Sequence, residues 1–261
     1  NLIGQGGGIQ VDGGTLKVED NTKIIGNGAK IGGGIYVFGG NLKMDSSTIK
    51  DCRASELGGA IYTKGTVKLE SCTLTDNAAN GQGGGVYVEN SSASFTLSGS
   101  TVVTPSSGSD VNALGKNDVY LENGRKIKIV HTLTGTAPVA RITVADANYA
   151  ASTQVLEAGS SVNLANEHTK FTVTPKGSEK WEIDSNGYLQ KTPVVINGSD
   201  SGAWQKLKDA VAAAAPGDTI TVRGSVKATN ASGNSGRIEI NKNLTIRGET
   251  GANSDILDAN S

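Results

Sequence analysis

Short stretches of alternating apolar and polar residues run through the first hundred positions of the chain and return at a nearly constant interval. One of them follows a glycine cluster: Gly-Gly-Gly-Ile-Gln-Val begins at Gly6, and similar segments begin at Gly32, Gly58 and Gly83, at steps of 26, 26 and 25 residues. Alternation with a period of two is typical of a β-strand that buries one face. Each copy therefore predicts a short strand, and the inward residues are Ile9, Ile35, Ile61 and Val86.

Two further motifs keep the same phase. An apolar pair spaced two residues apart starts at Leu16 and returns at Leu42, Val67 and Phe95. The third motif joins an apolar residue to a small or polar residue three positions later and repeats at steps of 25 residues. Its members are Ile24 with Asn27, Ile49 with Cys52, and Leu74 with Asn77.

Three short strands per cycle, separated by glycine or polar corners, predict one coil of a three-sided parallel β-helix. Coils stacked about 4.8 Å apart would pair each strand with its copy above and below. No single coil could bury its apolar face alone, so the stability of such a solenoid comes from stacking. The repeat predicts that residues 1–110 are β-helix coils of about 25 residues.

Asn27, Cys52 and Asn77 fall in one column of this predicted stack. Asparagine side chains at a β-helix corner can hydrogen-bond along the axis as an amide ladder, and we expect a structural role here. Cys52 would replace one rung as a small buried group. A disulfide with Cys72 is not expected, because that residue lies five positions before Asn77, about 16 Å along the strand.

The rest of the chain departs from the repeat. Residues 111–192 lose the period, and we expect either a small β-rich module or irregular coils that close the solenoid; 193–203 resemble a linker. Residues 204–261 are predicted to form a capping helix and the first coils of a β-helix, which would dock on the N-terminal coil of the same copy or of the next one. The predicted buried face of that helix contains Trp204, Leu207 and Val211.

Composition narrows the possible functions. Glycine accounts for 36 of the 261 residues, aromatic residues for 4%, and the net charge is −1. The balanced charge gives no electrostatic case for binding nucleic acid or an anionic membrane. No apolar run approaches the ~20 residues that span a bilayer, and the two cysteines form no metal-ligand pattern. The chain starts without a signal peptide, so we expect a piece of a longer polypeptide.

Two columns are candidate binding sites. Tyr36, Tyr62 and Tyr87 form an outward column, which either binds glycans or a partner or stacks on itself. Asp51 and Asp76 form a second column, which is a candidate site for a bound Ca²⁺ or for the acidic pair of a sugar-cleaving enzyme. No catalytic residue and no cofactor other than that Ca²⁺ is predicted.

Gly58-Gly59-Ala60-Ile61, combined with the motif that ends at Asn27, Cys52 and Asn77, resembles the repeats of polymorphic outer-membrane proteins and related bacterial β-helix adhesins. Ile or Leu stands where that family prefers Phe. More broadly, residues 1–105 are similar to right-handed β-helices of the pectin-lyase-like kind.

The resemblance implies an all-β, right-handed parallel β-helix with a short capping α-helix and a small irregular β module. It implies an extracellular structural or adhesive unit at a bacterial cell surface, not an enzyme. The expected partners are copies of the chain, joined end to end into a stalk or filament, and glycans or proteins of a host or neighbouring cell. A polysaccharide lyase or glycoside hydrolase is the alternative.

Overall fold

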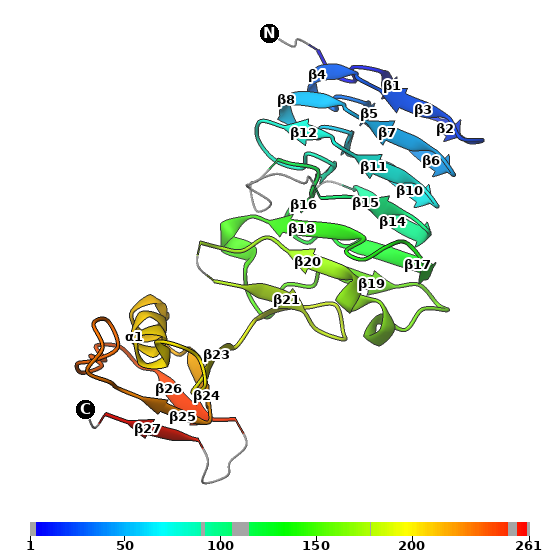
Figure 1. Ribbon diagram of the computed structural model, residues 1–261. Coiled ribbons are helices and arrows are strands. Elements are labelled where there is room, and N and C mark those ends of the chain that lie inside the picture. Colours follow the sequence, from blue (N-terminus) through cyan, green and yellow to red (C-terminus); the bar gives the residue numbers. More distant parts are fainter. Residues whose placement is uncertain (1–3, 90–91, 106–114, 178, 250–254, 260–261) are drawn as a thin grey trace. The chain divides into compact units, whose positions relative to one another are not determined.

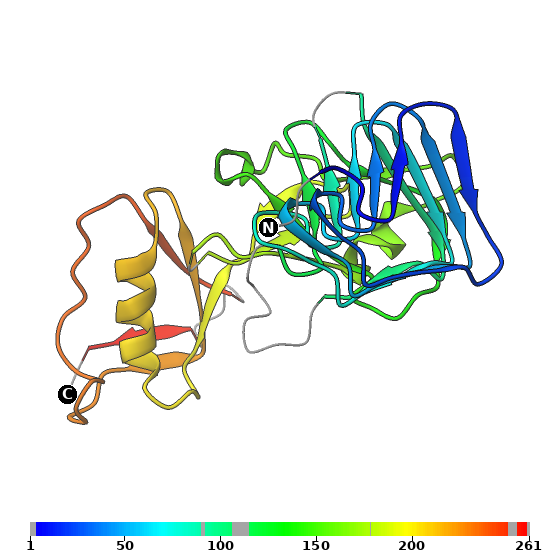
Figure 2. The same ribbon diagram turned by 90° about the horizontal axis from the view of Figure 1, so that it is seen from above.

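The computed structural model describes residues 4–89, 92–105, 115–177, 179–249 and 255–259, and the chain divides into two compact units, Asn1–Lys191 and Thr192–Ser261. The first unit is a parallel β-solenoid whose strands stack coil upon coil (Figure 1). Turned by 90°, the same unit shows successive coils overlapping one another (Figure 2). The predicted all-β, parallel stacked architecture is therefore confirmed.

Two long sheets form the main walls of the first unit, and every neighbouring pair within them is parallel. The seven-stranded sheet contains β1 (Ile9–Val11), β5 (Ile35–Val37), β9 (Ile61–Thr63), β13 (Val86–Val88), β16 (Val119–Leu121), β18 (Ala140–Val144) and β20 (Phe171–Val173). The six-stranded sheet contains β2 (Thr15–Val18), β6 (Asn41–Asp45), β10 (Thr66–Glu70), β14 (Ser94–Gly99), β17 (Ile127–Leu133) and β19 (Leu156–Ala158).

Two shorter sheets complete the early coils. One contains β3 (Lys23–Ile25), β7 (Thr48–Lys50), β11 (Thr73–Thr75) and β15 (Val102–Val103), and the other contains β4 (Gly28–Ile31), β8 (Arg53–Leu57) and β12 (Ala78–Ala79). Each early coil thus has four strands, one more than the motifs predict. The fourth strand escaped notice because its inward column consists of small alanines, Ala29, Ala54 and Ala79.

Residues a coil apart lie over one another and fill the core. Ile35 pairs with Ile9 on one side and Ile61 on the other, and Ile61 pairs with Val86. The ladder continues through Val119, Ile142 and Val173. Its members from Ile35 to Ile142 are 0% exposed. Burial of apolar side chains, shared between coils, is the main stabilising term in such a stack.

The described residues from 115 to 173 continue the solenoid, so this part of the predicted 111–192 segment consists of closing coils and not of a separate module. The sheets do not stop near residue 110: β16 to β20 extend both walls. The period is lost because the steps from Val86 to Val119, Ile142 and Val173 are 33, 23 and 31 residues. Short 3₁₀ helices occupy some of the corners, at Asp146–Asn148, Leu164–Asn166 and His168–Lys170. An antiparallel hairpin of β21 (Trp181–Ile183) and β22 (Leu189–Lys191) follows the last coil.

The second unit contains a helix and two small parallel sheets. Helix α1 (Ala203–Ala213) buries Trp204, Leu207 and Val211, the face that the spacing predicts. The predicted linker at 193–203 is wrong, because it contains a paired strand. One sheet consists of β23 (Val194–Asn197), β24 (Thr219–Arg223) and β26 (Thr245–Gly248), and the other of β25 (Ser225–Lys227) and β27 (Ile256–Asp258). Across the described residues, no helix is long and apolar enough to cross a membrane.

Candidate functional site

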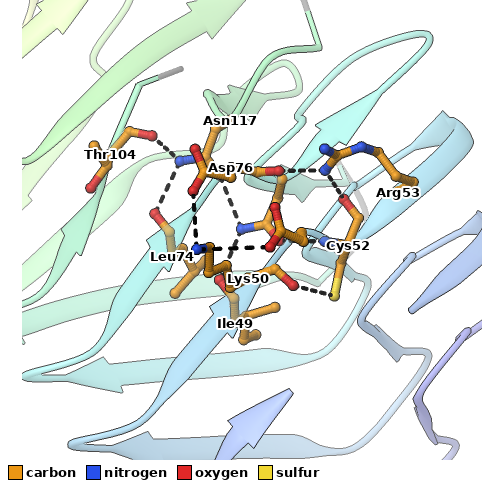
Figure 3. Close-up of polar contacts among 10 residues, drawn as sticks. Ile49, Lys50, Cys52, Arg53, Leu74, Asp76, Thr104 and Asn117 are labelled. Atoms are coloured by element: carbon orange, nitrogen blue, oxygen red, sulfur yellow. Dashed lines mark hydrogen bonds and ion pairs between the residues drawn. The ribbon is translucent and has the colours of Figure 1, made fainter. Parts of the chain in front are cut away.

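An asparagine ladder runs along one corner of the solenoid (Figure 3). The buried Asn77 side chain accepts a hydrogen bond from the Cys52 backbone N–H (3.0 Å) and donates to the Ile49 carbonyl (3.0 Å). It also donates to Oδ1 of Asn117 (3.1 Å), whose amide donates in turn to the Leu74 carbonyl (3.0 Å). The ladder satisfies buried backbone groups of several coils.

Asn117 is a rung that sequence reasoning missed. The longer step between Val86 and Val119 moves it out of the 25-residue phase. The motif spacing gives no signal for this rung, because Asn117 lies two positions before Val119 whereas Asn77 lies nine positions before Val86. At the other end of the column, the Asn27 side chain donates to the Ile25 carbonyl at 3.3 Å and is partly exposed.

Both cysteines are free and buried, and each takes a rung in a polar column. Cys52 replaces an asparagine, with its Sγ 3.5 Å from the Lys50 carbonyl oxygen. Cys72 stacks between Ser47 and Thr101. In that second column each side chain bonds a nearby backbone carbonyl: Ser47 to Asp45 at 2.7 Å, Cys72 to Glu70 at 3.1 Å, and Thr101 to Ser98 at 2.7 Å.

Neither thiol is expected to react in the folded protein. Burial raises the pKa of Cys52 and of Cys72 above the ordinary value, so the reactive thiolate is scarce near neutral pH. Labelling with Ellman's reagent at pH 8 should be about 100-fold or more slower than in the urea-unfolded chain. Rapid labelling of the folded protein would contradict the burial of both columns.

The Asp51 and Asp76 column forms a left-handed corner. The backbone φ angles of Gly26, Asp51 and Asp76 are +69°, +55° and +57°. Glycine and aspartate tolerate this region better than most residues, which explains why glycine takes the first position. The Lys50 ammonium lies 3.8 Å from a carboxylate oxygen of each aspartate. Among the described residues, no three His, Cys, Asp or Glu side chains gather as a metal site. The Lys50 ammonium therefore offsets part of the repulsion between the two carboxylates at this corner.

The tyrosine column is a buried stack and not an open binding stripe. Tyr36, Tyr62, Tyr87 and Tyr120 follow one another with ring centroids 5.3, 5.1 and 5.0 Å apart. Their exposed fractions are only 2–6%. The rings point away from the core, but each covers its neighbour, and side chains such as Leu57 pack against them. The tyrosine column was predicted either to bind glycans or a partner or to stack on itself, and the low exposure of the rings fits stacking.

The stack predicts unfolding in alkali. Burial raises the pKa of Tyr36, Tyr62, Tyr87 and Tyr120 above 10.0, and that of Tyr149 to about 12. The unfolded chain therefore loses these protons at a lower pH than the folded chain. Their contribution to stability is complete below pH 10 and falls as the pH rises above it, by about 1.4 kcal/mol per pH unit for each tyrosine.

Urea unfolding from pH 9 to 12 tests this expectation. The free energy of unfolding should fall less steeply above pH 10 in a Tyr62→Phe, Tyr87→Phe double variant than in the parent protein. Tyrosinate absorbance from the stack should rise together with the loss of far-ultraviolet circular dichroism. Full ionisation of the stack near pH 10 with native circular dichroism would contradict the burial argument.

A charged groove lies on the outer face of the six-stranded sheet. Its volume is about 690 Å³, and it spans β2, β6, β10, β14 and β17. Lysines line it in one row and carboxylates in a neighbouring row. Sequence reasoning missed this groove, although a lysine recurs between the two apolar residues of the motif that starts at Leu16. The lining residues include Lys17, Lys43, Lys68, Lys128, Glu19, Asp45, Glu70 and His131.

The fold and its polar ladders place the first unit among the parallel β-helices, in which stacked coils are the structural element. Residues 1–126 match the family model described as "Right handed beta helix region". The predicted similarity to right-handed β-helices is thereby confirmed for this part of the chain. No curated protein and no solved structure shows significant similarity to the chain.

Proposed function

We propose that this protein is a structural, adhesive β-helix unit of a bacterial cell-surface protein, and that copies join end to end into a stalk or filament. The observation that carries the proposal is the row of edge strands in the first coil and in the last coil of the described segments. In the first coil, β1 to β4 are each the edge strand of a sheet among the described strands. Ile9 and Leu16 are partly exposed there, whereas their partners Ile35 and Leu42 are 0% exposed.

The second unit offers a matching edge. Strands β26 and β27 are edge strands among the described ones, and Ile256 and Leu257 are 47% and 44% exposed. The register of β23, β24 and β26 advances in steps of 26 residues, the same step as from β1 to β5 and β9. Two open parallel edges with equal coil length are suited to pair, because unpaired strand edges favour association with another strand.

A filament of this kind would act through length and rigidity, and it needs no cofactor. The similarity of Gly58-Gly59-Ala60-Ile61 to bacterial adhesin repeats supports an extracellular, cell-surface location. Its outer face would meet surface glycans or proteins of a host or a neighbouring cell. The Lys50 ammonium between Asp51 and Asp76 weighs against an acidic catalytic pair at that corner.

Electron microscopy and sedimentation test the end-to-end proposal. Concentrated protein should form filaments with an axial repeat of about 4.8 Å. Leu257→Lys should shorten or abolish them, because it places a charge on the proposed docking edge. Val195→Lys, at a 38% exposed position of β23, is the matched control and should leave filament length unchanged. A chain that stays monomeric at high concentration would overturn the proposal for the isolated protein.

The charged groove favours one second candidate, a carbohydrate-active enzyme. Carboxylates of Glu19, Asp45 and Glu70 line a groove on an exposed sheet face, beside His131. Such an enzyme would release reducing ends or unsaturated products from polysaccharides, and Glu70→Gln would diminish that release. A panel of neutral and acidic polysaccharides, incubated with the purified protein, decides between the two functions.

A further inference from the structure

The outer face of the six-stranded sheet contains two parallel rows of opposite charge. Strand pairing places Lys17, Lys43 and Lys68 in one row. Lys43 of β6 pairs directly with Lys17 of β2 on one side and with Lys68 of β10 on the other. Two positions further along the same strands, Asp45 pairs with Glu70. Glu19 directly follows β2 and extends this second row.

These six side chains are exposed, and none of them forms an ion pair within the part of the chain that the structure describes. Like charges on directly paired strands repel each other. Each row therefore repeats an unfavourable contact at every coil, about 4.8 Å apart. A partner that presents both rows in the opposite order would relieve the repulsion in both.

A second copy of the same face is such a partner, in one orientation. A two-fold axis parallel to the solenoid, midway between the rows, sets the lysine row of each copy opposite the carboxylate row of the other. Lys43 then faces Asp45, and Lys68 faces Glu70, each on the same coil. A two-fold axis across the solenoid would instead oppose lysine to lysine. The side-chain lengths also fit this orientation, because the long lysine side chains of one copy lie opposite the shorter carboxylate side chains of the other.

We propose that two copies of this chain associate side by side, with their solenoids parallel, through this two-row face. The pairing goes beyond the proposed end-to-end assembly and does not depend on it, because it uses a sheet face and not a coil edge. A polyanion is a poorer occupant, since the three carboxylates offset the three lysines of the row, and Lys128, the fourth lysine of the groove, is paired with Glu157 at 3.2 Å. Contacts between exposed charges are individually weak and screened by salt, so the association should be reversible and favoured at low ionic strength.

Sedimentation equilibrium of the full chain at 20 and 500 mM NaCl tests the association. The Leu257→Lys background removes the proposed end-to-end contact, so only lateral pairing is measured. The dimer dissociation constant should rise at least 10-fold at the higher salt, and Lys43→Glu with Lys68→Glu should raise it at least 10-fold at low salt. Lys23→Glu with Lys180→Glu changes the net charge equally at exposed positions outside the groove and should leave it unchanged.

Charge reversal and cross-linking test the orientation. A chain with its lysine row changed to glutamate and a chain with its carboxylate row changed to lysine should each be monomeric, and their mixture should dimerise. Lys68→Cys mixed with Glu70→Cys should give heterodimers with a short bis-maleimide linker, whereas Lys17→Cys mixed with Glu70→Cys should not. A monomer at low salt, a salt-insensitive dimer, or cross-linking of the second mixture alone would overturn the proposal. Filament length in the parent background reports on end-to-end assembly separately.

Discussion

Replacing Gly59 by alanine should destabilise the first unit by about 3 kcal/mol or more. A Cβ at this position would lie 2.3 Å from the Gly84 carbonyl oxygen and 2.4 Å from that of Ala78. Both atoms belong to the backbone, so no side chain can turn away.

The surrounding coils cannot separate without losing hydrogen bonds. The Gly59 N–H donates to the Gly83 carbonyl at 3.0 Å, and the Ala60 N–H donates to the Gly84 carbonyl at 3.0 Å. Gly33, one coil earlier, is confined in the same way, since its Cβ would meet the Arg53 carbonyl oxygen at 2.3 Å. Glycine in this column is therefore a requirement of coil spacing.

Urea unfolding followed by circular dichroism measures the loss. Gly13→Ala is the matched control, because no heavy atom lies within 4 Å of a Cβ there and its φ is not positive. The control should change stability by no more than about 0.5 kcal/mol. Equal stability of the two variants would show that the coils adjust their spacing freely and that the close approach has no energetic consequence.

Asn77→Ala should destabilise the same unit by about 3–5 kcal/mol. The substitution leaves the Cys52 N–H, the Ile49 carbonyl and the Asn117 Oδ1 without their partner inside the solenoid. Each buried polar group deprived of a hydrogen bond costs about 1–3 kcal/mol. Asn77→Asp should be at least as harmful, because it keeps the acceptor but removes both donated bonds and buries a charge.

Two variants in the same column complete the test. Asn27→Ala should lose only about 1 kcal/mol, since that side chain is partly exposed and donates one bond at 3.3 Å. Cys52→Asn restores an amide to the middle rung and should not destabilise by more than about 1 kcal/mol. Thermal unfolding of all four variants gives the ranking, and an Asn77→Ala protein as stable as Asn27→Ala would contradict a ladder role.

The features that the sequence pattern does not predict lie between the repeats, outside the motifs themselves. The Asn117 rung and the coils from β16 onward were hidden because variable corners change the step from 25 to 33, 23 and 31 residues. Val194–Asn197 resembled a linker because its strand partner, β24, lies beyond a helix. Strand pairing at such separations depends on the whole coil, and local residue preference does not specify it.

By itself the sequence determined which side chains stack. A step near 26 residues placed Ile35 over Ile61 and kept Cys52 and Cys72 apart. The helical spacing of Trp204, Leu207 and Val211 predicted the buried face of α1, because periodicity follows directly from strand and helix geometry. Only the tertiary structure decided how exposed each column is. It buried the tyrosine stack, set Lys50 between two aspartates, and left two rows of opposite charge open on one face. The exposure of a side chain depends on which neighbouring coils and corners cover it, and the complete tertiary structure determines this covering.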